Sequence, residues 1–174
     1  RAALPALVAV LHDKHQESMV RHEAAEALGA IGSEEAVTVL QTYCDDPAPE
    51  VSETCQLALD RLKWMWENKG SPEGWSENPF MSVDPAPAFA GKDVDELKGI
   101  LLNEEETLFN RYRAMFALRN LRSESAVAAL SCGLQAGSAL FRHEVAFVLG
   151  QLQHSAAVDA LKRQLQDPAE NEMV

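Results

Sequence analysis

The phrase that decides the fold runs from Met19 to Gly32 and reads MVRHEAAEALGAIG. A second version, from Leu140 to Leu152, reads LFRHEVAFVLGQL. In both phrases, small and aliphatic residues recur at intervals of three and four, which is typical of an amphipathic helix. Both also place Arg-His-Glu at the same position. The chain therefore repeats one structural unit.

The repeat has a period of about 31 residues. The first phrase aligns with residues 50–59 at a shift of 31, and the second aligns with residues 111–121 at the same shift. Units of this length that each hold two helical patterns are typical of an α-solenoid. We therefore predict an all-α repeat superhelix with helices over residues 2–12, 18–31, 34–44, 49–67, 93–102, 107–121, 124–135, 139–152 and 155–166.

The helical pattern is interrupted between Asn68 and Lys92, where four prolines and three glycines occur. Such a composition is typical of a linker. We expect two half-stacks of repeats, residues 1–67 and residues 93–174, joined by a Pro-rich linker over 68–92. The linker aromatics Phe80 and Phe89 are expected to pin the linker to the helices rather than to bind a ligand.

Composition limits the possible functions. The 174 residues are 47% hydrophobic, which allows a packed core, and the formal net charge of -12 argues against nucleic-acid binding because no basic stripe could neutralise phosphates. No apolar run reaches the ~18 residues of a membrane span. The three cysteines, Cys44, Cys55 and Cys132, show no CxxC spacing, so we expect reduced thiols and a cytoplasmic location.

Each phrase carries a His-Glu pair, His22-Glu23 and His143-Glu144. At 100° per residue, both histidines fall almost opposite the apolar stripe of their helix, and Glu23 lies on its flank. We therefore expect the imidazoles to be presented by the helix and not to be core histidines. The two stripes consist of Val20, Ala24, Ala27, Leu28 and Ile31 in the first copy, and Phe141, Val145, Val148, Leu149 and Leu152 in the second.

Three interpretations of these pairs compete. They can be solvated polar residues, or an acid–base pair that acts without a metal. The third interpretation is metal binding, because neutral imidazole with carboxylate is a ligand set that iron, manganese and zinc accept. Two copies in register favour this third interpretation.

The spacing of the two pairs constrains how they could meet. Glu53-Thr54 and Tyr112-Arg113 occupy the intervening repeat positions, so His22 and His143 would lie on the order of 30 Å apart in a straight stack. They can share a centre only if the linker lets one half-stack face the other. The sequence therefore predicts a two-metal centre built from both halves.

The phrase around Arg21 resembles the second helix of HEAT-like repeats. Together with the connector Met81–Pro87 (MSVDPAP) and the segment Arg111–Arg119 (RYRAMFALR), it makes the whole chain resemble the deoxyhypusine hydroxylase family. That family hydroxylates the deoxyhypusine side chain on eukaryotic translation initiation factor five A, which completes hypusine synthesis. It uses two irons and molecular oxygen as co-substrate.

The resemblance implies a role for each candidate residue. His22 and Glu23 would ligate the first iron, and His143 would ligate the second. Glu144 would either ligate iron or bind the substrate amine, a cation that needs a carboxylate partner. Met19 would either line the substrate site or serve as ordinary packing.

The chain departs from the family pattern in having two His-Glu pairs where a complete member has four. Six residues recur at an offset of 154, so the register predicts Arg-His-Glu directly after Val174. They are Ala6, Leu7, Leu11, Asp13, Met19 and Val20, which reappear as Ala160, Leu161, Leu165, Asp167, Met173 and Val174. We therefore expect an internal fragment that lacks the outer repeats and self-associates through uncapped ends. Two alternatives remain: a non-catalytic HEAT-repeat scaffold that binds a basic protein partner, and a HEAT-like bilin lyase relative.

We predict that the isolated 174-residue chain binds iron weakly and has little or no hydroxylase activity, because each iron would lack the ligands of an adjacent repeat. Elemental analysis and a turnover assay check this prediction. An iron content near two per chain with normal turnover would contradict it.

Overall fold

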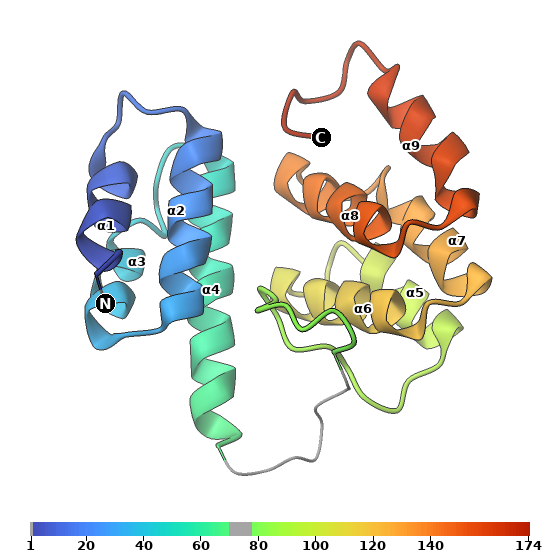
Figure 1. Cartoon of the computed structure of the whole chain (residues 1–174), viewed down its shortest axis with the longest axis horizontal. Coiled ribbons are helices and arrows are strands. Elements are labelled where there is room, and N and C mark those ends of the chain that lie inside the picture. The colour runs from blue at the N-terminus through green and yellow to red at the C-terminus, as the bar shows by residue number, and fades with distance from the viewer. Residues whose placement is uncertain (1, 70–77) are drawn as a thin grey trace. The chain divides into compact units, whose positions relative to one another are not determined.

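The computed structural model describes residues 2–69 and 78–174, and within those ranges every regular element is a helix (Figure 1). The predicted helices are all present and end within three residues of their predicted bounds, which confirms the all-α repeat fold. The helices are α1 (Leu4–His12), α2 (Ser18–Ile31), α3 (Glu34–Thr42), α4 (Pro49–Glu67), α5 (Val94–Leu102), α6 (Leu108–Leu121), α7 (Glu124–Gly133), α8 (Ala139–Leu152) and α9 (Val158–Leu165), with a 3-10 turn η1 (Ser155–Ala157) before α9.

The described residues form two compact units. The first consists of residues 2–69 with 83–86, and the second of residues 78–82 with 87–174. The first unit therefore contains α1 to α4, and the second contains α5 to α9. Part of the predicted linker, residues 70–77, lies outside the described residues.

Local sequence signals set the helix ends. Gly32 ends α2 in the left-handed conformation, with φ of 61°, and the next residue, Ser33, accepts a hydrogen bond from the Ala36 amide at the start of α3. Ser123 and Ser138 cap α7 and α8 in the same way. The boundary predicted at Gly32-Ser33 is confirmed.

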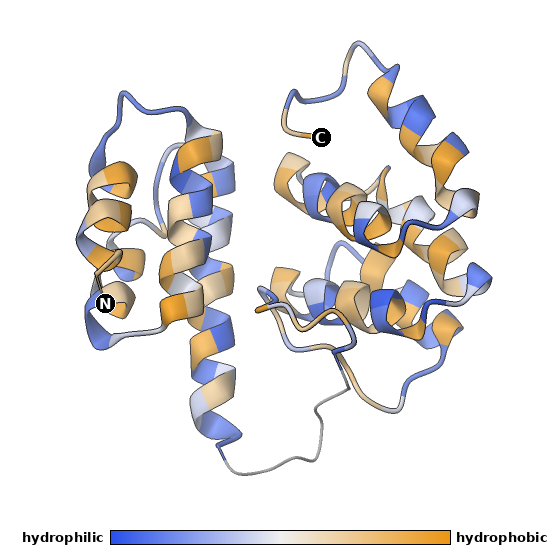
Figure 2. Ribbon diagram, viewed as in Figure 1, coloured by the Kyte–Doolittle hydropathy of each residue, from blue (hydrophilic) through white to orange (hydrophobic). Residues whose placement is uncertain are grey.

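The first unit packs around a close contact between α2 and α4. A Cβ built on Gly29 would lie 2.5 Å from the Cβ of Ala58, so only glycine allows the two helices to come this close. The helices carry hydrophobic and hydrophilic residues side by side (Figure 2). The hydrophobic ones form a continuous core that includes Leu11, Leu28, Leu40 and Val51, all with no exposed surface.

The second unit has a larger, aromatic core. Tyr112 and Phe141 meet edge to face with ring centroids 5.9 Å apart, and the guanidinium of Arg111 lies 4.0 Å from the centre of the Phe141 ring. These contacts join α6 to α8. Val145 of α8 also packs beside Gly133 of α7.

Part of the predicted linker is held on α6 by arginines. Arg119 is fully buried with its guanidinium between the rings of Phe80 and Phe116, at 4.5 and 4.7 Å, and it donates a hydrogen bond to the side chain of Asn78. Arg113 stacks on Phe89 at 4.0 Å. The expectation that Phe80 and Phe89 pin this segment to the helices is confirmed.

The structure also bears on the state of the cysteines and on membrane-spanning helices. Cys44, Cys55 and Cys132 are free thiols, as predicted. Burial raises the pKa of the Cys55 thiol to about 12, which keeps it protonated and unreactive. Within residues 2–69 and 78–174, no helix has both the length and the apolar character needed to cross a bilayer.

We predict that Gly29→Ala destabilises the first unit by about 1–3 kcal/mol, because the new methyl group must push α2 away from Ala58. Gly150 is the matched control, since it holds the same place in the second phrase and has open space around its Cβ position. Gly150→Ala should raise stability by about 0.5–1 kcal/mol through helix propensity. Thermal unfolding followed by circular dichroism measures both changes, and equal effects of the two variants would contradict the packing account.

Candidate metal centre

A buried ion pair fixes the start of α2, the helix that carries the first His-Glu pair. The Nε of Arg21 donates to the carbonyl oxygen of Leu11 at 3.1 Å, and its Nη2 lies 2.5 Å from Oδ2 of Asp46. The side chains of Arg21 and Asp46 are only 6% and 2% exposed. The hydrogen bond from Arg21 lowers the pKa of Asp46, so the pair is charged at neutral pH. His22, the next residue, is therefore held in a defined orientation.

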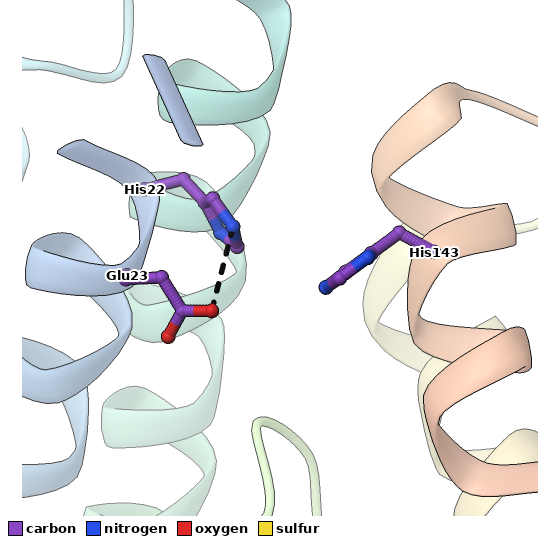
Figure 3. A group of neighbouring side chains, drawn as sticks. All are labelled: His22, Glu23 and His143. Carbon is purple, nitrogen blue, oxygen red and sulfur yellow. Dashed lines mark ion pairs between the residues drawn. The ribbon is translucent and has the colours of Figure 1, made fainter. Parts of the chain in front are cut away.

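His22 and Glu23 lie on one turn of α2 with their side chains toward each other (Figure 3). Nε2 of His22 is 3.8 Å from Oε1 of Glu23. The imidazole is 2% exposed, whereas the carboxylate is 67% exposed. The presentation of the His22 imidazole by the helix stays a prediction, and the exposed carboxylate of Glu23 is accessible to a ligand.

The packed surface of α2 is wider than a single apolar stripe, because both α1 and α4 contact this helix. Gly29 faces α4, and His22 lies seven residues earlier, which is 20° away around the helix axis by the 3.6-residue period. The Cα–Cβ bond of His22 therefore lies near the edge of the face that contacts α4. The predicted apolar stripe is wrong at Val20 and Ile31, which are 43% and 41% exposed.

His143 and Glu144 of α8 have the opposite pattern of burial. His143 (Figure 3) is partly buried and Glu144 is 7% exposed. Within its unit, α8 contacts α6, which belongs to the preceding repeat, whereas α2 contacts α4 of the following repeat. The neighbouring second helix therefore packs on opposite sides of the two phrases.

Met173 orients the imidazole of His143. Nδ1 of His143 lies 2.7 Å from the carbonyl oxygen of Met173. A carbonyl oxygen only accepts, so Nδ1 carries the proton, and the lone pair of the neutral ring is on Nε2. An N–H bond from the second ring nitrogen to a carbonyl is the usual support for a metal-binding histidine.

The donor set of the first unit fits a metal ion. Two donors that bind one ion at about 2.0–2.2 Å each can be at most about 4.2–4.4 Å apart. The 3.8 Å between Nε2 of His22 and Oε1 of Glu23 is within that limit. Imidazole nitrogen with carboxylate oxygen also suits iron, manganese or zinc.

Met19, the other candidate, lies one turn before His22 and is 41% exposed. It is therefore not part of the unit's packed core, and its role in the substrate site or in packing stays a prediction.

The sequence analysis missed a second carboxylate on the same helix. Glu26 is partly buried, and burial, together with Glu23 and Asp84 nearby, raises its pKa to about 7. Three carboxylates in one region create a negative potential that favours a cation. The signal was present, because Glu26 follows His22 by four residues and so lies on nearly the same side of α2.

Comparison with known proteins identifies first the class of repeat protein and then proteins that are similar along the whole chain. Residues 1–60 match HEAT repeats, and residues 111–131 and 141–167 match the PBS lyase HEAT-like repeat. The chain therefore belongs to the class of HEAT-like repeat proteins, as its helix pairs indicate.

Over its whole length the chain is similar to deoxyhypusine hydroxylases. It is 56% identical to that of Gallus gallus over 174 residues and 56% identical to that of Homo sapiens over 172, which is 100% and 99% of this chain. A solved structure of human deoxyhypusine hydroxylase in complex with glycerol covers 99% of the chain with a TM-score of 0.94 and 55% identity. The family resemblance drawn from the sequence is confirmed.

The chain spans 57% and 56% of the length of these two relatives and 59% of the solved chain.

We predict that Glu26→Gln stabilises the first unit at neutral and alkaline pH. A carboxyl whose pKa is about 7 in the folded state and 4.5 ordinarily takes up a proton on folding between these pH values, so stability is lost as pH rises through that window. Removing the carboxylate should restore about 1–3 kcal/mol above pH 7 and little at pH 4.5.

Denaturant unfolding at several pH values measures this difference. Exposed Glu35 on α3 provides the control, since Glu35→Gln should leave the pH dependence unchanged. If Glu26→Gln raised the free energy of unfolding equally at all pH values, the titration of Glu26 would not be the cause of the increase.

Proposed function

We propose that the chain forms part of an iron-dependent monooxygenase that hydroxylates the deoxyhypusine side chain on eukaryotic translation initiation factor five A. The observation that supports this most strongly is the donor pair of His22 and Glu23, set 3.8 Å apart, in a chain that is 56% identical along its length to deoxyhypusine hydroxylase. The free thiols are consistent with the reducing cytoplasm, where we place the enzyme.

In this proposal the chain supplies ligands to two irons. His22 and Glu23 bind the first iron, and His143 binds the second through Nε2. The Met173 carbonyl supports this assignment, because it takes the Nδ1 proton of His143 as a hydrogen bond at 2.7 Å. When bound, the irons supply the oxidation chemistry, with molecular oxygen as co-substrate.

The carboxylates bind and orient the substrate, whose side chain carries amines. Glu144 is 7% exposed, and a carboxylate so poorly hydrated favours a close cationic partner. We assign it to the substrate amine or to the second iron. Glu23 and Glu26 add negative charge beside the first iron. Met19, which is 41% exposed, is assigned to the apolar part of the substrate side chain in this proposal.

The two alternative functions explain less of the chain. A PBS lyase HEAT-like match covers residues 111–131 and 141–167, whereas the hydroxylase relatives match the whole chain. A scaffold that binds a basic partner would use the acidic surface but would not need imidazole next to carboxylate in two repeats.

We predict that His22→Ala and His143→Ala each lower the iron affinity of the full-length protein at least about tenfold, because each removes a nitrogen ligand. Iron content after dialysis against a chelator, with hydroxylation of the modified factor as a second readout, measures the loss.

Two histidines outside the centre serve as controls. His15→Ala changes an exposed residue, and His154→Asn keeps a side chain that can accept the Ala156 amide. Both controls should retain iron. If His22→Ala and His143→Ala keep as much iron as the controls do, the proposed metal centre is wrong.

A further inference from the structure

The segment after α9 contacts α8 at two neighbouring residues. His143 donates from Nδ1 to the carbonyl of Met173, and Arg142, the residue before it, pairs with Glu170. Met173 is 6% exposed, so its carbonyl is not displaced by bulk water. One short segment, residues 167–174, therefore contacts both the arginine and the histidine of the second phrase.

The Arg142–Glu170 pair has two parallel hydrogen bonds. Nε of Arg142 lies 2.9 Å from Oε2 of Glu170, and Nη2 lies 2.6 Å from Oε1. The side chains are 21% and 10% exposed, and the hydrogen bond from Arg142 lowers the pKa of Glu170 below its usual range. Gln164 also donates to this carboxylate. Forked guanidinium–carboxylate pairs of this kind fix direction as well as distance.

Glu170 is linked to the Met173 carbonyl through Asn171. The Asn171 amide donates to Oε1 of Glu170 at 2.6 Å, and the Asn171 side chain accepts from the Met173 amide at 2.9 Å. A second bond, from the Val174 amide to the Asn171 carbonyl at 2.9 Å, closes the turn around Met173. The orientation of the carbonyl that meets His143 thus depends on the Glu170 carboxylate.

We propose that Arg142, Glu170 and Asn171 are positioning residues that hold the Met173 carbonyl against Nδ1 of His143 and so make Nε2 the atom that His143 offers to a metal. The link to metal binding rests on the proposed function, whereas the tautomer of His143 does not. Arg142 and Glu170 act through Met173 and touch neither substrate nor metal.

The tautomer can be measured directly in the 174-residue chain labelled with ¹⁵N-histidine. Long-range ¹H–¹⁵N spectra at a pH of about 8, where histidine side chains are ordinarily neutral, show which ring nitrogen carries the proton. We expect the proton of His143 on Nδ1. In Glu170→Gln and in Asn171→Ala, we expect a mixture with the Nε2-protonated form.

Asn171→Ala is the variant that we expect to fold normally, because Asn171 is exposed and its replacement leaves no buried charge unpaired. The matched control is Asp46→Asn, which weakens the equivalent arginine–carboxylate pair in the first unit and should leave the His143 spectrum unchanged. An Nε2 proton on His143 in the unsubstituted chain, or an unchanged spectrum in a folded Asn171→Ala variant, would overturn the proposal.

Iron affinity of the full-length protein separates this inference from the proposed function. A Glu170→Gln variant with a shifted tautomer should bind iron about 10–100-fold more weakly, the usual cost of removing support for a metal ligand. A shifted tautomer with unchanged iron affinity would support the positioning role and count against His143 as an iron ligand.

Discussion

A buried arginine near the start of a second helix ties together the two helices of a repeat. Arg21 donates from Nε to the Leu11 carbonyl at 3.1 Å, and Arg111 donates from Nε to the Leu101 carbonyl at 2.9 Å. Each acceptor lies one residue before the end of the preceding helix. Because a buried guanidinium must have its hydrogen bonds satisfied, this contact fixes how the second helix is rotated against the first. The side chain of the residue that follows the arginine therefore leaves the helix in a fixed direction. That residue is His22 in α2 and the core residue Tyr112 in α6.

Which side of a second helix is covered depends on which neighbouring repeat packs against it. Helix α2 packs against α4 of the following repeat, and α8 packs against α6 of the preceding repeat. The same three-residue phrase thus gives a buried imidazole beside an exposed carboxylate in one unit and a buried carboxylate in the other. A single repeated motif can in this way supply a metal ligand at one position and a desolvated partner for an amine at another.

Much of the fold follows from the sequence, because helix ends depend on local chemistry such as Gly32-Ser33. The period of 31 residues and the candidate residues His22 and His143 could also be recognised, since both arise from repetition. The low exposure of His22 could not be predicted, because it depends on tertiary packing and not on the apolar stripe of α2. The hydrogen bond that orients His143 could not be predicted either, because its acceptor is the backbone carbonyl of Met173. No side-chain pattern in the sequence indicates such a contact.

The most direct measurement is anomalous diffraction at the iron absorption edge from crystals of the full-length protein loaded with iron. We expect two peaks, one bound by the imidazole of His22 and the carboxylate of Glu23, the other bound by Nε2 of His143. Iron bound elsewhere, with these side chains directed to solvent or to the protein interior, would contradict the assignment of the His-Glu pairs as metal ligands.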